Sequence, residues 1–232
     1  KPLMKEDTYE EDSLVQEPGT LEVSHVSFAY PGGEKIYEDF NLSAAPGQII
    51  GVTGAVACGK STLGKTFLCE YPYEGRIRFH GKELSEMTKA ERTGMIGYLG
   101  HDPELFNDTI RNNVLLGDQG DVETYLQAVC FDGEVKEMED GTETMVGNSG
   151  VRLSGGQAQR LALARTLCHK RPVLILDDPF SALDRKTEEE VFANLRKLAA
   201  DSIVLLLSHR LYLFPEMDQV LWMEDGKVTA GT

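Results

Sequence analysis

The chain has 232 residues, of which 38 are acidic and 23 are basic, and its formal net charge at neutral pH is −15. A chain of this length can bury about 70% of the surface that it exposes when unfolded. Its composition, 41% hydrophobic and 26% charged, is ordinary for a globular protein. The composition therefore excludes a disordered, fibrous or membrane-spanning chain. Because the net field repels polyanions, we also expect no nucleic-acid partner.

The N-terminal segment 1–20 differs in composition from the rest of the chain. It carries six acidic residues and two lysines, has few large apolar side chains, and ends close to Pro18 and Gly19. Such a segment cannot bury enough apolar surface to order itself. We therefore interpret residues 1–20 as an acidic linker.

Strand-like patterns begin at Leu21 and lead to a turn and a helix. Residues 21–28 form a run typical of a half-buried strand, and Ile49–Val52 predicts a buried strand that ends in a glycine-rich turn. A helix is predicted from Lys60, with Leu63 and Phe67 on one face. The segment from about 85 to 165 lacks such apolar strands, and we expect it to be mostly helical and to form an inserted subdomain.

The C-terminal part has a strand, helix and strand pattern. Val173–Leu176 and Ile203–Leu207 are short apolar runs typical of parallel strands covered on both faces, and Thr187–Ala200 has helical spacing. Both runs are far shorter than the ~20 apolar residues that cross a bilayer. The pattern predicts an α/β core. The four cysteines form no C-x-x-C pair and no signal-peptide pattern opens the chain, which indicates a reducing, cytosolic compartment.

A phosphate-binding motif lies between the predicted strand and the helix that follows it. The sequence G-x-x-x-x-G-K-[ST] is matched by Gly54, Ala55, Val56, Ala57, Cys58, Gly59, Lys60 and Ser61, and Thr62 follows it. In this motif backbone N–H groups surround the phosphates, the lysine reaches the β- and γ-phosphates, and the hydroxyl ligates Mg²⁺. A chance glycine turn would not explain the strand before it. The motif predicts binding of a nucleoside triphosphate, a property that kinases and GTPases share.

An aspartate at the end of another predicted strand fits the same site. Asp177 ends the apolar run Val173–Leu176, where a carboxylate can hold Mg²⁺ through water. An apolar strand that ends in aspartate is common, so the assignment depends on the phosphate-binding motif. Together the two elements predict a site for Mg·ATP.

The run Leu153-Ser154-Gly155-Gly156-Gln157 stands before a predicted helix. At this point the sequence resembles the ATP-binding cassette family over about residues 21–232. The resemblance implies a P-loop NTPase (RecA-like) core with a parallel sheet, an N-terminal antiparallel β subdomain and a helical subdomain inserted at about 85–165. It also implies that Ser154, Gly155, Gly156 and Gln157 bind the γ-phosphate of ATP held by a second such domain, in a head-to-tail dimer with two ATP molecules.

Other positions match the family's motifs one by one. Tyr30 resembles the aromatic residue that stacks on adenine. Ser181–Asp184 looks like the D-loop, which crosses the dimer, and the resemblance makes Asp184 a nucleotide-site residue. His209 looks like the switch histidine that contacts the γ-phosphate.

Two further segments resemble those of exporter-type cassettes. Met95–Ile110 is similar to their Q-loop region, and Thr144–Gly150 matches the pattern T-x-V-G-E-x-G except at Asn148. The resemblance implies an exporter cassette at the cytoplasmic face of the cell membrane, held by a transmembrane domain. The acidic linker would then follow that domain, which is absent from this sequence.

Three further positions depart from the family pattern. The family has a glutamate as general base where this chain has Asp178, a Q-loop glutamine that positions metal and water where it has His101, and a glycine in the phosphate loop where it has Ala57. All three lie on the face that forms the chain's own ATP site, whereas the signature Ser154–Gln157 is intact and the face offered to a partner is complete apart from Asn148. This distribution resembles heterodimeric exporters, in which one site is degenerate and a different chain supplies the competent one. An ordinary homodimer that tolerates Asp178 is the alternative.

Three other functions compete with the exporter interpretation. One is a cassette that binds ATP without hydrolysis and acts as a regulatory clamp, and another is the stand-alone ATPase subunit of an importer. A DNA-maintenance cassette is disfavoured, because the chain lacks long heptad repeats between its motifs and carries a charge of −15. The transported substrate cannot be inferred from this sequence.

Overall fold

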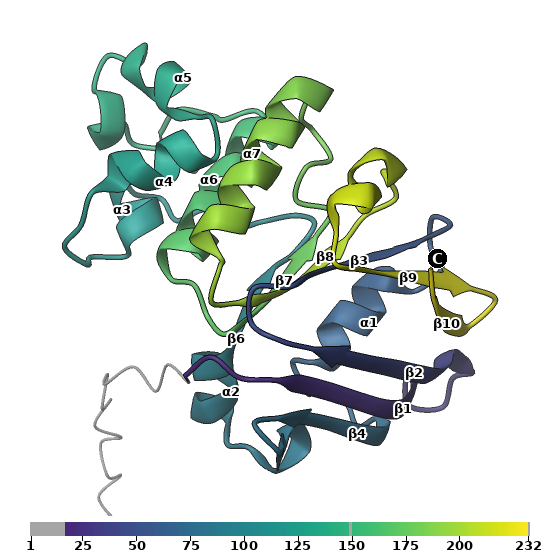
Figure 1. Ribbon diagram of the computed structural model, residues 1–232. Coiled ribbons are helices and arrows are strands. Elements are labelled where there is room, and N and C mark those ends of the chain that lie inside the picture. The colour runs from purple at the N-terminus through teal and green to yellow at the C-terminus, as the bar shows by residue number, and fades with distance from the viewer. Residues whose placement is uncertain (1–16, 149, 232) are drawn as a thin grey trace, which may run out of the picture.

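The computed structural model describes residues 17–148 and 150–231, and most of the predicted linker 1–20 lies outside them. Within the described residues, ten strands form one mixed sheet in the order β5-β4-β1-β2-β10-β9-β3-β8-β7-β6 (Figure 1). The N-terminal strands form one end of this sheet and a parallel block forms the other. The predicted α/β fold with an N-terminal antiparallel β subdomain is confirmed.

The N-terminal end of the sheet is antiparallel. Its strands are β1 (Leu21–Ala29), β2 (Lys35–Ala44), β4 (Glu74–Phe79) and β5 (Lys82–Glu83). β1 pairs with β2 on one side and β4 on the other. The C-terminal hairpin of β9 (Gln219–Glu224) and β10 (Lys227–Ala230) joins this end to the rest, because β10 pairs with β2 and β9 pairs with β3.

The parallel block carries the loops of the site. It contains β3 (Ile49–Gly54), β6 (Ile96–Leu99), β7 (Val173–Asp177) and β8 (Ile203–Leu207). Every residue of β7 and β8 is buried, because successive side chains point to opposite faces and both faces are covered. Leu174 and Leu176 enter one core, and Val173 and Ile175 enter the other.

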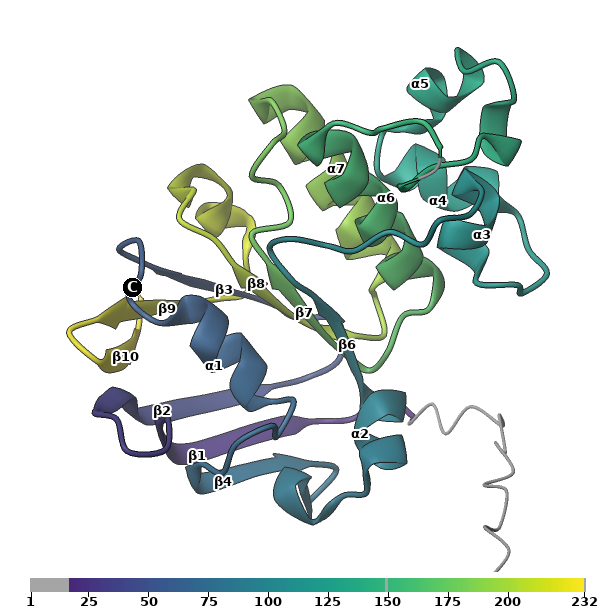
Figure 2. The ribbon, with the colours of Figure 1, turned by 180° about the vertical axis from the view of Figure 1, so that it is seen from behind.

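Helices cover the two faces of the parallel block unequally. α1 (Lys60–Thr66) lies between this block and the antiparallel strands (Figure 2), and Leu63 and Phe67 are fully buried there, as predicted. α6 (Gly155–Cys168) and α7 (Arg185–Leu198) pack on the opposite face. Helix α7 begins two residues before the expected position, because the Asp184 side chain accepts a hydrogen bond from the Thr187 N–H and caps it.

A group of short helices packs against α6. It contains α3 (Ile110–Leu115) and α4 (Val122–Ala128), which contact α6, and α5 (Asp132–Lys136), which contacts α4. Short 3₁₀ helices lie at Leu84–Glu86, Gly141–Glu143 and Leu211–Glu216.

The expectation that 85–165 lacks core strands is wrong at one place. β6 lies inside this segment and pairs in parallel with β7 at the edge of the main sheet. Helix α2 (Lys89–Met95), capped by Thr88, leads directly into it. The sheet therefore takes in part of a segment that the sequence assigned to helices.

Candidate nucleotide site

A cavity of about 350 Å³ lies at the carboxyl edge of the parallel strands, the edge at which α/β sheets bind ligands. The loops after β3, β6, β7 and β8 contribute its walls. Its lining residues are Val56, Ala57, Gly59, Lys60, Ser61, Thr62, His101, Asp177, Asp178, Leu207, Ser208 and His209. The phosphate-binding motif and the residues predicted as magnesium ligand, base and switch histidine are therefore brought together.

Lys60 is held by the loop that it ends. Its Nζ donates hydrogen bonds to the carbonyl oxygens of Gly54 at 2.9 Å and Ala55 at 2.8 Å, and lies 3.6 Å from Cys58 Sγ. These acceptors are neutral, whereas hydrogen bonds to phosphate oxygens are charge-assisted and stronger. An anionic phosphate in the cavity would therefore compete favourably for this ammonium group.

The loop adopts a conformation that suits glycine. Gly59, the residue before α1, has a φ of 103°, and a Cβ on Gly54 would lie 2.2 Å from the carbonyl oxygen of Met223. Ala57 has a φ of 63°, in the left-handed region, which costs an L-residue about 1–2 kcal/mol. The loop thus keeps its shape at Ala57 under strain that a glycine would not have.

Asp177 and Ser61 form an oxygen-rich corner of the cavity. Asp177 is 5% exposed at the end of β7, and burial raises the pKa of its carboxyl group, while a hydrogen bond with Ser61 opposes that rise. Within the described residues, no group of three or more His, Cys, Asp or Glu side chains is placed to hold a metal. A hydroxyl and one carboxylate suit Mg²⁺, which takes few protein ligands and completes its shell with phosphates and water.

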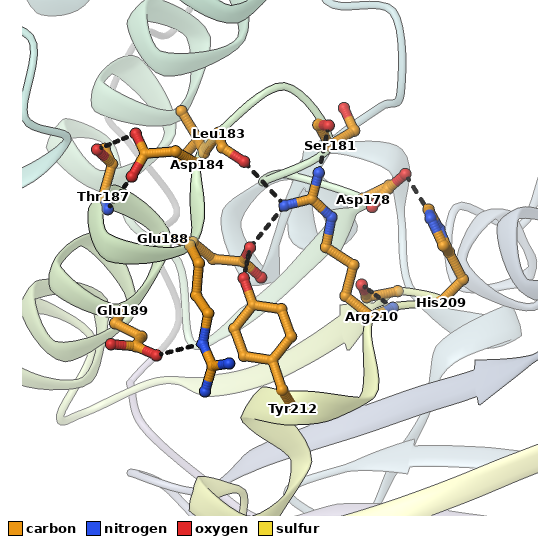
Figure 3. Close-up of polar contacts among 12 residues, drawn as sticks. Asp178, Ser181, Leu183, Asp184, Thr187, Glu188, Glu189, His209, Arg210 and Tyr212 are labelled. Carbon is orange, nitrogen blue, oxygen red and sulfur yellow. Dashed lines mark hydrogen bonds and ion pairs between the residues drawn. The ribbon is translucent and has the colours of Figure 1, made fainter.

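Asp178 lies between two imidazoles. Its Oδ2 is 3.7 Å from His209 Nδ1 and 3.9 Å from His101 Nδ1, and Figure 3 shows the approach from His209. Its backbone has a φ of 50°, and its N–H donates to the carbonyl oxygen of Leu207. The other carboxylate oxygen is buried without a hydrogen-bond partner in the described part of the chain. A buried orphan acceptor beside the cavity is compatible with a missing donor such as water.

Tyr30 does not line the cavity. Its ring is 39% exposed and stands edge-on to Phe28 at 5.1 Å and to Tyr71 at 5.3 Å between centroids. Sequence reasoning did not identify Tyr71, which is 43% exposed and lies 41 positions along the chain from Tyr30 (71 − 30). The adenine-stacking role of Tyr30 stays a prediction.

The signature residues lie outside the cavity, at the start of α6. Ser154 Oγ accepts from the Gln157 N–H and Gln157 Oε1 accepts from the Ser154 N–H, so the two form a capping box. A Cβ added at Gly155 would find no heavy atom within 4 Å. At Gly156 it would lie 3.2 Å from Ala182. The signature is thus exposed at Gly155 and abuts the segment 181–184 at Gly156.

Asp184, predicted as a nucleotide-site residue, also lies outside the cavity. Its carboxylate accepts hydrogen bonds from the N–H and the hydroxyl of Thr187, at 3.1 and 2.6 Å (Figure 3). These hydrogen bonds hold the pKa of Asp184 below its usual value. Within this chain, therefore, Asp184 acts as the N-cap of α7.

The fold and the cavity define a P-loop nucleoside triphosphatase. Residues 37–181 match the family model of the ABC transporter. The chain is 36% identical over 220 residues to the probable multidrug resistance ABC transporter ATP-binding/permease protein YheI of Bacillus subtilis (strain 168), covering 92% of this chain and 38% of that protein. It is 37% identical over 222 residues to an ATP-dependent lipid A-core flippase of Burkholderia thailandensis, covering 93% and 37%.

A solved structure gives the same result. The structure of a bacterial Atm1-family ABC exporter with ATP bound matches with a TM-score of 0.84 at 30% identity, over 93% of this chain and 39% of that one. The chain belongs to the ABC transporter family. The names of these proteins describe a probable multidrug resistance transporter, a flippase and an exporter, so the importer interpretation is not favoured.

The chain spans less than two fifths of the length of these relatives. Among residues 17–148 and 150–231, no helix combines the length and the apolar character needed to cross a bilayer.

Proposed function

We propose that this chain is the ATP-binding domain of an exporter and that it couples ATP binding and hydrolysis to transport across a membrane. A transmembrane domain would hold it at the cytoplasmic face of the cell membrane. A second domain of the same kind would close on it head-to-tail around two ATP molecules. The cavity with Lys60, Ser61 and Asp177 supports the proposal, because it combines phosphate and magnesium ligands at one sheet edge.

The residues of the cavity divide the binding of Mg·ATP between them. Lys60 and the N–H groups of residues 55–62 would bind the phosphates, and Ser61 and Asp177 would hold Mg²⁺, which neutralises phosphate charge when bound. His209 lines the same cavity and would contact the γ-phosphate. Tyr30, at the end of the antiparallel strand β1, would stack on the adenine ring.

We further propose that this chain's own site is degenerate. A general base must reach the water that it deprotonates, and misplacement on the order of 1 Å can cost about 10²-fold in rate. Asp178 is one methylene shorter than glutamate, and two imidazoles flank one of its oxygens. His101 supplies a rigid ring where an amide is usual in the family, and Ala57 strains the phosphate loop.

The single observation that carries this asymmetry is the contrast between the two faces. Ala57, His101 and Asp178 all line one cavity, while Ser154–Gln157 lies outside it with Gly155 open to solvent. Asn148 is the one departure that does not line the cavity. A partner of a different sequence would supply the competent ATP site, and Ser154–Gln157 would complete it. A homodimer would place the same departures in both sites.

The test compares Asp178→Asn with Ser154→Ala in the full-length protein assembled with its partner. Asp178→Asn should change steady-state ATP turnover by less than about twofold, because it removes a base that already works poorly. Ser154→Ala should lower turnover by about tenfold or more, because it removes a γ-phosphate donor from the competent site. Equal losses from the two variants would contradict the asymmetric assignment.

A cassette that binds ATP without hydrolysis is the rival proposal, and the placement of Asp178 between His101 and His209 favours it for this chain's own site. The two proposals differ for the assembled complex. A complex that binds Mg·ATP but shows no turnover above background would support the regulatory clamp. Turnover that depends on Ser154 would support the transport ATPase.

A further inference from the structure

Arg210 links the loop after β8 to the loop after β7. It follows His209 directly, and its Nη2 donates to the carbonyl oxygen of Ser181 at 2.6 Å while its Nη1 donates to that of Leu183 at 3.0 Å (Figure 3). The two carbonyls flank Ala182. A single guanidinium group therefore ties the backbone of 181–184 to the segment that carries His209.

Glu188 fixes the guanidinium from the other side. Its Oε2 accepts from Arg210 Nη1 at 2.6 Å and also from the Tyr212 hydroxyl. The Glu188 side chain is 1% exposed, and its Oε1 has no hydrogen-bond partner in the described part of the chain. A carboxylate buried in this way depends on its cation for neutralisation. Arg210 is thus anchored by a group that cannot turn outward to water.

Tyr212 adds a further restraint on this cluster. Its ring lies under the Arg185 guanidinium, with 4.8 Å from the Arg185 carbon Cζ to the ring centroid. Arg185 in turn pairs with Glu189 on the same helix. The first turn of α7 and the segment after His209 are therefore joined by a second contact that does not involve Arg210.

Loop 181–184 is otherwise held by the packing of Leu183 against the core and by the Asp184 cap of α7. Within the described residues, the backbone N–H groups of this loop make short-range hydrogen bonds: Ser181 N–H to the carbonyl of Asp178, and Leu183 N–H to that of Phe180. On its outer side Ala182 lies beside Gly156 of the signature. The planar guanidinium group of Arg210, called the fork below, thus supplies the long-range hydrogen bonds that fix the position of this loop relative to His209.

We propose that Arg210 is a positioning residue that holds loop 181–184 and His209 in one fixed arrangement. The inference rests on the proposed function, in which His209 faces the nucleotide and loop 181–184 faces the second domain. Arg210 does not line the cavity, so it acts on the turnover step through the loop and leaves Mg·ATP binding intact. Its planar fork serves three acceptors at once, which the compact ammonium of lysine does not reproduce.

The test uses the full-length protein with its partner and two ways of removing the fork. Arg210→Lys keeps the charge opposite Glu188 but loses the planar fork. The double variant Arg210→Met with Glu188→Leu removes both buried charges together, which avoids leaving an unpaired carboxylate in the interior. The matched control is Arg196→Lys, because Arg196 also binds one carboxylate, that of Asp218, and one carbonyl, away from the cavity.

Three quantities are measured: affinity for Mg·ATP, kcat and KM of ATP hydrolysis, and amide hydrogen exchange of residues 181–184 without nucleotide. Both fork variants should lower kcat by roughly 10- to 100-fold, since a loop displaced by about 1 Å has an effect of that order. KM and Mg·ATP affinity should stay within about twofold. Exchange at 181–184 should accelerate by about tenfold or more, since these amides then open more readily. The control should change none of these values.

Wild-type kcat and wild-type exchange in both fork variants would overturn the proposal and leave Arg210 as an ordinary ion pair. Equal losses in the Arg196→Lys control would also overturn it, because the effect would then come from general destabilisation. Failure of the proposed function has a different signature, since the wild-type protein would not bind Mg·ATP. In that case the exchange measurement, made without nucleotide, still decides whether Arg210 fixes the loop.

Discussion

The cavity and the signature are built from different kinds of local structure. In the cavity, Ala57 and Asp178 have positive φ values of 63° and 50°, and Asp177 is almost fully buried. At the signature, Ser154 and Gln157 satisfy each other's backbone groups, and Gly155 stands in open space. The contrast indicates that packing within this chain holds the strained loops of the cavity in place. The signature is complete within this chain, and under the proposed function its ligand is the ATP held by the second domain.

The comparison predicts its largest effect at Gly155. Gly155→Leu should lower ATP turnover of the assembled complex by about 100-fold or more, because the side chain fills the surface offered to the second ATP and blocks its anion contacts. The thermal midpoint should not fall, because nothing within the chain occupies this space.

The matched control for this prediction is Gly133→Leu on α5, where a Cβ also meets nothing within 4 Å. Turnover measured by phosphate release should be normal in the control. Similar losses at Gly133 and Gly155 would show that the signature surface has no special role.

The cavity side is tested most directly at Lys60. Lys60→Ala should weaken Mg·ATP binding by roughly 10- to 100-fold, the value of one or two hydrogen bonds to a charged group. Binding is measured by equilibrium titration with a fluorescent ATP analogue. Lys65→Ala, on the same helix but outside the cavity lining, is the control and should bind normally.

A smaller effect is expected from lengthening the weak base. Asp178→Glu should raise turnover at this chain's own site by about tenfold, less than the 10²-fold that 1 Å of misplacement can cost, because His101 and Ala57 remain. The measurement is ATP hydrolysis in a complex whose partner site is inactivated. An unchanged rate would show that the missing methylene is not what limits this site.

The smallest prediction concerns strain in the phosphate loop. Ala57→Gly should raise the free energy of unfolding by about 1 kcal/mol, because glycine accepts the left-handed conformation without steric cost. This corresponds to a rise of about 2–4 °C in the thermal midpoint. Ala55→Gly has no positive φ to relieve and should destabilise slightly. A fall in the midpoint for Ala57→Gly would contradict the strain assignment.

The parts of the fold that could be predicted from the sequence are those whose signal is local. Val173–Asp177 and Ile203–Leu207 are continuous apolar runs because both faces of the sheet are covered. β6 has only four residues, Ile96–Leu99, includes a glycine, and owes its identity to pairing with β7. No local pattern distinguishes such an edge strand from the helix that precedes it.

The site likewise contains residues that a local signal identifies and contacts that depend on the tertiary structure. The phosphate loop and Asp177 follow from local motifs, and His209 follows from the family resemblance. Asp177, His209 and most of the phosphate loop line the cavity. The contacts of Tyr71 with Tyr30 and of Arg210 with Ser181 join residues far apart in the chain. Their partners follow from the order of strands in the sheet, which the motifs do not encode.

That strand order has a consequence for how the protein is made. β3, which carries the phosphate loop, lies between β8 and β9, and β9 and β10 are formed by residues 219–230. During synthesis, the N-terminal strands and the phosphate-loop strand emerge long before the hairpin that joins them. Until then β2 and β3 each present an unpaired edge, the kind of surface that pairs wrongly with other chains. Residues 219–230 therefore decide when the two parts of the sheet become one, although they lie far along the chain from both strands that they join.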